Sequence, residues 1–153
     1  MDKIDVQILD ILQRDGRIQR NKIAEKVGLT IPAVSERMRK LEQKNIIRGY
    51  HAKVNNSAIG KDVTAFVFVN TTPSKKYNSF VDNTYKVNDI IECYSITGEG
   101  SHLLKIQIDS TKSLETLLSE IQSWDGVLQT RTYIALSSYK EFSSLLPSPN
   151  LLK

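Results

Sequence analysis

The sequence predicts an α+β chain of two domains: three helices at the N-terminus, then an antiparallel sheet with two helices. Three observations support this. Apolar residues in the first sixty positions recur at helical spacing, whereas beyond Lys61 segments with a period of two alternate with helical stripes. The net charge of +4 is also uneven, because residues 1–60 hold twelve Lys and Arg against seven Asp and Glu, and residues 61–153 hold nine against ten. The first domain is therefore suited to a polyanionic partner.

The N-terminal domain is expected to contain three short helices. The first covers residues 3–14, and the second is a shorter helix that Gly28 ends with a left-handed backbone. Thr30 caps a third helix that has Pro32 in its first turn and runs to about Lys44. The apolar residues that these helices turn towards a shared core are Ile4, Ile8, Ile11, Leu12, Ile23, Ala24, Val27, Val34, Met38 and Leu41.

The spacing of Ala24, Gly28 and Val34 is typical of a helix-turn-helix unit, whose second helix presents its outer face to the DNA major groove. Three-helix units also serve as plain protein contacts, but the basic charge of this domain favours DNA. The residues expected to reach base edges are Thr30, Pro32, Ser35 and Glu36. The residues expected to meet phosphates are Arg39, Lys40, Lys44 and Arg48.

The C-terminal half orders strand, helix and strand twice, which is the ferredoxin-like βαββαβ arrangement with both helices on one face of the sheet. Its strands are expected at residues 63–69, 90–97, 102–108 and 127–138, with one helix starting at Thr72-Pro73 and another around residues 114–121. The expected boundaries are 1–45 for the helix-turn-helix (winged-helix-like) domain, 46–61 for a linker strand or extended hinge, 62–140 for the ferredoxin-like domain and 141–153 for a tail.

The first expected strand is apolar on both of its faces. Two helices cover only one face of a sheet of four strands, so Phe66 and Phe68 on the other face need a second cover. A second copy of the chain is the simplest cover, and the N-terminal domain or the tail are the alternatives. We therefore predict a homodimer.

The composition argues against several other classes of protein. The longest apolar run, at residues 65–69, is far shorter than the roughly 20 residues that span a bilayer, and the N-terminus lacks the pattern of a secretory signal. The single Cys93 cannot form an internal disulfide, which fits a reducing cytoplasm. His51 and His102 lie in different elements with no matching ligand spacing. We therefore expect no metal, no cofactor and no catalytic site.

These motifs closely resemble the Lrp/AsnC family, the leucine-responsive or feast/famine transcription factors. In the N-terminal half the matching segments are Leu9-x-x-Leu12-Gln13-x-Asp15-Gly16-Arg17, Ile23-Ala24-x-x-Val27-Gly28-Leu29-Thr30, Val34-Ser35-x-Arg37-Met38-x-x-Leu41-Glu42 and Ile47-x-Gly49-Tyr50. In the C-terminal half they are Thr97-Gly98, Leu103-Leu104-Lys105 and Gly126-Val127-x-x-Thr130-x-Thr132. The resemblance spans about residues 2–140. It implies a ligand-sensing C-terminal domain and dimers that associate into octamers or similar discs.

The resemblance also implies that an amino acid or a related small molecule binds near the turn after the second strand and between neighbouring dimers. The corresponding positions here are Gly98, Glu99, Gly100, Ser101, Thr130 and Thr132. Glycine amides suit a carboxylate, and threonine hydroxyls would orient it. Family members often have an acidic residue where Ser101 stands, and Glu99 is the substitute that this chain offers for a ligand ammonium. Gln19 stands where the family usually has a serine cap for the second helix.

The sequence therefore predicts a cytoplasmic, nucleoid-associated transcriptional regulator that binds operator DNA as a dimer or higher oligomer, with modulation by an amino acid or a related small molecule. Two alternatives share this architecture. One is a sequence-tolerant protein that wraps DNA, and the other is a tetrapyrrole decarboxylase-like enzyme. The enzyme would have a degraded DNA face and basic or histidine residues around a cavity, whereas this third helix is basic and histidines are scarce.

Overall fold

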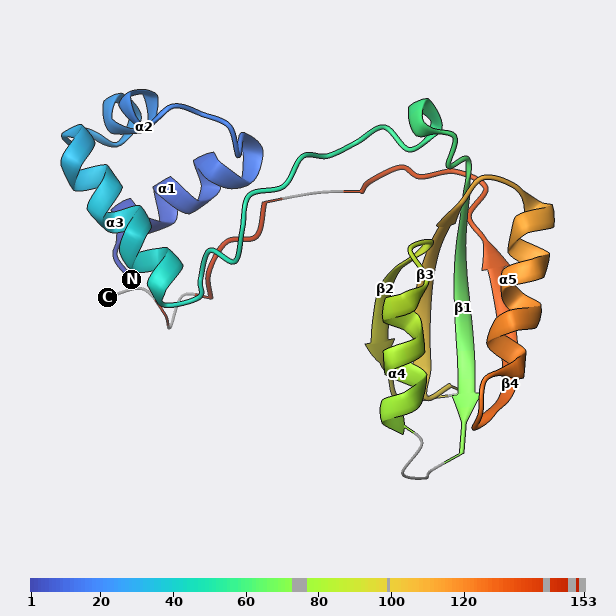
Figure 1. The fold of residues 1–153 in the computed structure, drawn as a ribbon. Helices are drawn as coiled ribbons and strands as arrows, with labels where there is room; N and C mark the ends of the chain where they lie inside the picture. The colour runs from blue at the N-terminus through green and yellow to red at the C-terminus, as the bar shows by residue number, and fades with distance from the viewer. Residues whose placement is uncertain (73–76, 99, 142–143, 149–150, 152–153) are drawn as a thin grey trace. The chain divides into compact units, whose positions relative to one another are not determined.

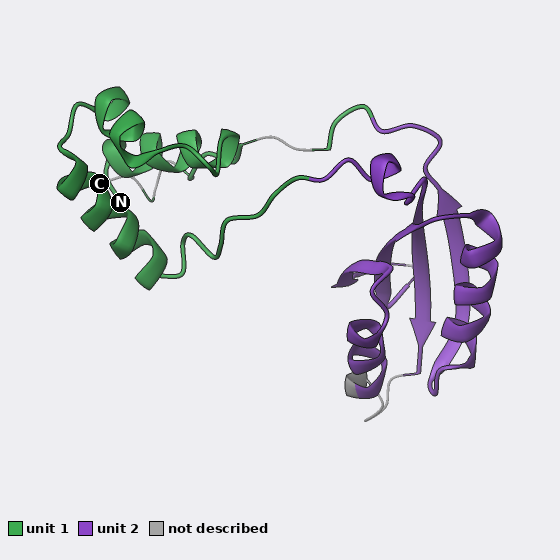
Figure 2. Ribbon diagram, turned by 45° about the horizontal axis from the view of Figure 1, so that its top comes forward, with its two compact units in different colours: residues 1–53, 139–153 green, residues 54–138 purple. Residues whose placement is uncertain are grey.

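The computed structural model describes residues 1–72, 77–98, 100–141, 144–148 and 151 (Figure 1). The chain divides into two compact units, Met1–Lys53 with Tyr139–Lys153 and Val54–Ser138 (Figure 2). Within the described residues, no helix has both the length and the apolar character needed to cross a membrane.

The first unit contains α1 (Lys3–Arg14), α2 (Arg20–Val27) and α3 (Ile31–Gln43), as the apolar spacing predicts. Asp2 begins α1 with a capping box, in which the amides of Asp2 and Asp5 each donate to the other residue's carboxylate. Thr30 caps α3 by accepting from the amide of Ala33. The buried core of the three helices consists of Ile8, Leu12, Ile23, Ala24, Val34, Met38 and Leu41.

The turn between α2 and α3 depends on a left-handed residue. Gly28 has φ +69°, a conformation that residues with a side chain rarely adopt, and this confirms its expected place at the end of α2. Gln19 precedes α2 without a capping side-chain hydrogen bond. The start of α2 therefore lacks the side-chain acceptor that a serine would supply.

The tail that follows the sheet belongs to the first unit. The side chain of Gln13 pairs with the backbone of Leu145, because its Nε2 donates to the carbonyl at 3.0 Å and its Oε1 accepts from the amide at 2.9 Å. Lys53 also lies 2.7 Å from the carboxylate of Glu141. These contacts join residues after the sheet to residues 1–53.

The second unit is a four-stranded antiparallel sheet with two helices, in the ferredoxin-like order β2-β3-β1-β4. The strands are β1 (Val63–Thr71), β2 (Ile90–Ser95), β3 (His102–Ile108) and β4 (Val127–Ile134), and the helices are α4 (Tyr77–Lys86) and α5 (Thr111–Ser123). A short 3-10 helix, η1 (Ser57–Ile59), precedes β1. Both helices run along the sheet in Figure 1.

The helices share one face of this sheet. The buried core of the unit consists of Ala65, Val67, Val69, Phe80, Leu104, Ile106, Ile108, Leu114, Leu117 and Ile121. Val67 pairs with Leu104 and Thr132, so these three residues point to the covered face. Phe66 and Phe68 therefore point to the other face, as predicted from the alternation.

Two strands are shorter than predicted. The fourth was expected to reach residue 138 but ends at Ile134, because its partner β1 begins at Val63 and the last cross-strand bond joins the Ala135 amide to the Thr64 carbonyl. The second ends at Ser95 because Ser95 pairs with the first residue of β3. Residues 46–54 contain no strand, and the amides of Ile46 and Ile47 bond to the Leu41 carbonyl near the end of α3. Pro73, at the expected start of α4, lies outside the described residues.

Candidate functional site

The outer face of α3 brings together most of the residues predicted to meet DNA. Val34, Met38 and Leu41 are buried on the inner side of the helix. On the opposite side Pro32, Glu36, Arg39 and Lys40 are exposed and Ser35 is half-buried, at spacings that repeat every helical turn. Thr30, Lys44 and Arg48 are exposed at or beyond the ends of the helix.

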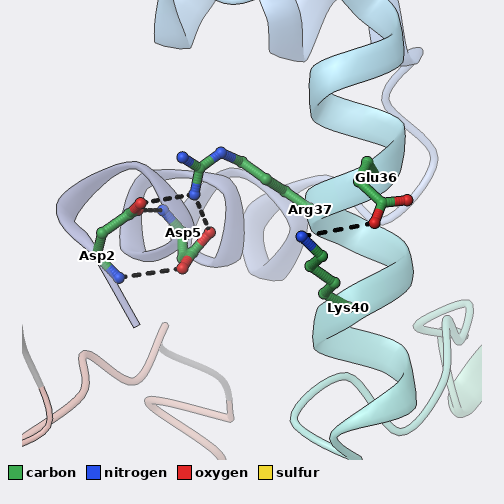
Figure 3. Close-up of polar contacts among 5 residues, drawn as sticks. All are labelled: Asp2, Asp5, Glu36, Arg37 and Lys40. Carbon is green, nitrogen blue, oxygen red and sulfur yellow. Dashed lines mark hydrogen bonds and ion pairs between the residues drawn. The ribbon is translucent and has the colours of Figure 1, made fainter.

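The charged residues on this face pair with one another. Arg39 donates through Nε to Oε2 of Glu36 at 2.8 Å and through Nη2 to Oε1 at 2.7 Å. Lys40 Nζ lies 3.5 Å from the same Oε1, as the dashed line in Figure 3 marks. The hydrogen bonds from Arg39 keep the pKa of Glu36 below its usual value, and Glu36 raises the pKa of Arg39 in return. Glu36 and Arg39 are therefore both charged at neutral pH.

Arg37 has a different role that the sequence pattern did not reveal. Its Nη1 donates to Asp2 Oδ2 at 2.7 Å and to Asp5 Oδ1 at 2.6 Å, so it links α3 to the start of α1 (Figure 3). These hydrogen bonds raise the pKa of the guanidinium. The amide of Asp5, followed by Arg37, lowers the pKa of the Asp2 carboxyl. Arg37 is thus a clamp within the domain and not an outward-facing cation.

The turn between β2 and β3 holds part of the predicted effector set. Gly98 is exposed with φ +108°, and a Cβ there would meet no atom within 4 Å. Gly100 is buried, with a Cβ position 3.6 Å from Phe68 Cβ. Ser101 Oγ lies 3.0 Å from the Val69 carbonyl and accepts from the Thr71 amide at 3.0 Å. This serine therefore ties the turn to β1. Glu99 lies outside the described residues.

The two predicted threonines lie across β1 from this turn. Val69 pairs with His102 on one side and with Thr130 on the other, so the turn and Thr130 lie at the same end of the sheet, about 10 Å apart at ordinary strand spacing. Thr130 and Thr132 point to the helix-covered face, and Thr130 Oγ1 accepts from Gln122 of α5 at 2.8 Å. The hydroxyl of Thr130 is thus engaged by α5.

The open face of the sheet carries a pocket that the sequence did not indicate. It has a volume of about 430 Å³ and is lined by Phe68, Asn70, Gln129, Arg131 and Tyr133 from β1 and β4. Phe68 and Tyr133 form its aromatic side, with ring centroids 5.7 Å apart in an edge-to-face arrangement. The uncovered face over β1 and β4 is therefore aromatic, with amides and a guanidinium beside the rings.

The other residue types that could carry catalysis or bind a metal are histidine and cysteine. His102 is buried against Phe80, and burial lowers its pKa. Cys93 is half-buried, and burial raises the pKa of its thiol. Within the described part of the chain, no three His, Cys, Asp or Glu side chains gather where they could hold a metal ion.

Two family models match the two units. One, described as winged helix-turn-helix DNA-binding, matches residues 1–48, and the other, described as the Lrp/AsnC ligand binding domain, matches residues 64–145. The chain belongs to the Lrp/AsnC family of transcriptional regulators. The resemblance seen in the sequence motifs is therefore confirmed, and the function class is regulation rather than catalysis.

Individual members of the Lrp/AsnC family resemble the chain along nearly its whole length. It is 34% identical over 145 residues to the HTH-type transcriptional regulator FL11 of Pyrococcus abyssi, with 95% of each chain covered. It is 32% identical over 151 residues to the leucine-responsive regulatory protein of Escherichia coli, covering 95% of this chain and 91% of the relative. A solved regulator from Neisseria meningitidis in complex with L-methionine matches with a TM-score of 0.92 and 27% identity, covering 99% of both chains.

Proposed function

We propose that this Lrp/AsnC chain binds operator DNA as a homodimer, with the outer face of α3 in the major groove of one half-site per protomer. The observation that carries the proposal is the division of α3 into two sides. Val34, Met38 and Leu41 anchor one side in the domain core, and the other side is exposed and cationic. Because its apolar side stays packed in the core, α3 can place its outer side in the major groove of DNA while the domain remains folded.

Roles on this surface follow from position along α3. Thr30, Pro32, Ser35 and Glu36 lie in its N-terminal half, where recognition helices contact base edges. The cations towards its C-terminal end, which would meet phosphates, are Arg39, Lys40, Lys44 and Arg48. The protein would thus act on chromosomal DNA in the cytoplasm.

The dimer would form through the open face of the sheet. Phe68 and Tyr133 place aromatic surface there, and a second copy would remove it from water. Phe68→Asp should give a monomer in analytical ultracentrifugation at micromolar concentration. Tyr85→Asp is the control, because Tyr85 is an exposed aromatic on α4. A Phe68→Asp chain that still sediments as a dimer would contradict this interface. The dimers formed in this way would assemble further into an octamer.

The effector would be an amino acid or a related small acid at the turn between β2 and β3. Gly98 leaves its backbone open there, and glycine amides suit a carboxylate. Ser101 lacks the negative charge that would pair with a ligand ammonium, and its hydroxyl already holds the turn on β1. The remaining proposed contacts are Glu99, Gly100, Thr130 and Thr132. The L-methionine complex of the Neisseria regulator supports this class of ligand.

Two measurements test the proposal as a whole. Affinity for operator DNA selected from a genomic library should exceed affinity for random duplex at one fixed salt concentration. Equal affinities would instead indicate a sequence-tolerant DNA-wrapping protein. A thermal-shift screen of amino acids, combined with sedimentation, should reveal an effector that stabilises the chain and changes its oligomer size; no stabilisation and no change of size would refute the sensing role.

A further inference from the structure

Glu36 stands between the residues expected to read bases and the cations expected to hold phosphates. Its carboxylate accepts two hydrogen bonds from Arg39, at 2.8 and 2.7 Å, and lies 3.5 Å from Lys40 Nζ. The two-bond geometry of Arg39 is the one by which a guanidinium binds a phosphate. Glu36 therefore occupies two of the five N–H donors of Arg39, in the paired geometry that a DNA phosphate would use.

The pairing also reduces the positive charge of the reading surface. Glu36, Arg39 and Lys40 together carry one net positive charge, whereas the two cations alone would carry two. All three side chains are about half exposed, at 46%, 52% and 60%, so DNA phosphates can reach them and compete with Glu36. Arg37 does not take part in this competition, because Asp2 and Asp5 hold its guanidinium on another side of α3.

A carboxylate in the major groove binds only hydrogen-bond donors. The cytosine edge presents an amino group there, whereas guanine presents two acceptors and thymine an acceptor and a methyl group. Adenine places an acceptor beside its amino group, which repels a carboxylate and suits an amide instead. Cytosine is therefore the base that best compensates the carboxylate of Glu36 once DNA covers it.

We propose that Glu36 determines the DNA specificity of this chain at one base pair per half-site: it competes with phosphates for Arg39 and Lys40, and it releases them when it accepts a hydrogen bond from the amino group of a cytosine. The inference rests on the proposed placement of α3 in the major groove. On non-cognate DNA Glu36 opposes binding, and at a cognate site it contributes a base contact.

The test compares the full-length chain with Glu36→Gln. At about 100 mM KCl the variant should bind a mixed-sequence duplex about three- to tenfold more tightly, and its affinity should fall more steeply with salt, by about one unit in the logarithmic slope. Selection from a random duplex pool should enrich one cytosine per half-site with the native chain. The variant should lose that cytosine and enrich adenine there, because glutamine pairs with the adenine edge.

Glu25→Gln is the matched control, because Glu25 also pairs with a lysine, Lys22, at 3.4 Å, and both side chains are exposed. It should change affinity less than twofold and leave the selected sequence unchanged. If Glu36→Gln binds mixed DNA no more tightly, or still selects the same cytosine, the inference is wrong. If charge reversal of Arg39 and Lys40 weakens binding in the same assay, the proposed DNA surface survives and only the role of Glu36 falls; if that reversal has no effect, the proposed surface falls as well.

Discussion

Replacing Arg37 with methionine should loosen the helix-turn-helix domain while leaving the sheet domain intact. The change removes both charged hydrogen bonds from Nη1, so the neighbouring carboxylates of Asp2 and Asp5 lose the guanidinium that pairs with them. Asp5 is 17% exposed, and a partly buried hydrogen bond to a charged group contributes about 1.5 kcal/mol at the lower end of its range. Asp2 is 44% exposed, and a surface ion pair of this kind contributes about 0.5 kcal/mol. The expected loss is about 2 kcal/mol.

Hydrogen exchange on the full-length chain measures this loss within one unit. A loss of about 2 kcal/mol should make the slowest amides of α1 and α3 exchange about 30-fold faster, since about 1.4 kcal/mol corresponds to a factor of ten. Amides of β1 and β3 should be unaffected. Arg17→Met is the control, because the structure shows no ion pair of Arg17 with any described residue. Equal exchange in the two variants would refute the clamp.

The remaining predictions concern a helix cap and a buried histidine. Gln19→Ser should stabilise the N-terminal domain by about 0.5–1 kcal/mol, because the start of α2 lacks a side-chain cap; exchange of the α2 amides should slow about two- to fivefold, and no slowing would contradict this. Burial lowers the pKa of His102 below 6.5, so the unfolded chain binds this proton at a higher pH than the folded chain does. The free energy of unfolding of the sheet domain should therefore fall as the pH drops below 6.5, by at most about 1.4 kcal/mol per pH unit. In His102→Gln, urea denaturation at several pH values should show a free energy of unfolding that depends less on pH than in the native chain. An unchanged pH dependence would refute the proposal that His102 causes this loss of stability.

The elements of this fold were predictable wherever a local pattern determines them. The stripe of α3 and the glycine that ends α2 are local features, and both are confirmed. The ends of β2 and β4 were not predictable, because a strand extends only as far as its partner and the pairing register is not local. The face of the sheet to which Thr130 points was not predictable for the same reason, because it depends on the pairing of Thr130 with Val69.

The contacts of the candidate site were also predictable only where they are local in the sequence. The pairing of Glu36 with Arg39 and Lys40 follows from spacings of three and four on a helix, so the sequence contained that signal. Arg37 lies 35 and 32 positions from Asp2 and Asp5, and only the packing of α3 against α1 brings them together. The spacing of residues along α3 therefore gave no indication that Arg37 is a clamp.

The most direct test of the account is the affinity of the Arg39→Glu, Lys40→Glu double variant for duplex DNA at moderate ionic strength. Reversing both charges removes two expected phosphate contacts, so affinity should fall at least a hundredfold and the logarithmic salt slope should become shallower by about two units. Circular dichroism should show an unchanged fold, because both side chains are exposed. An unchanged affinity and salt slope in a folded double variant would contradict the assignment of α3 as the DNA-binding surface.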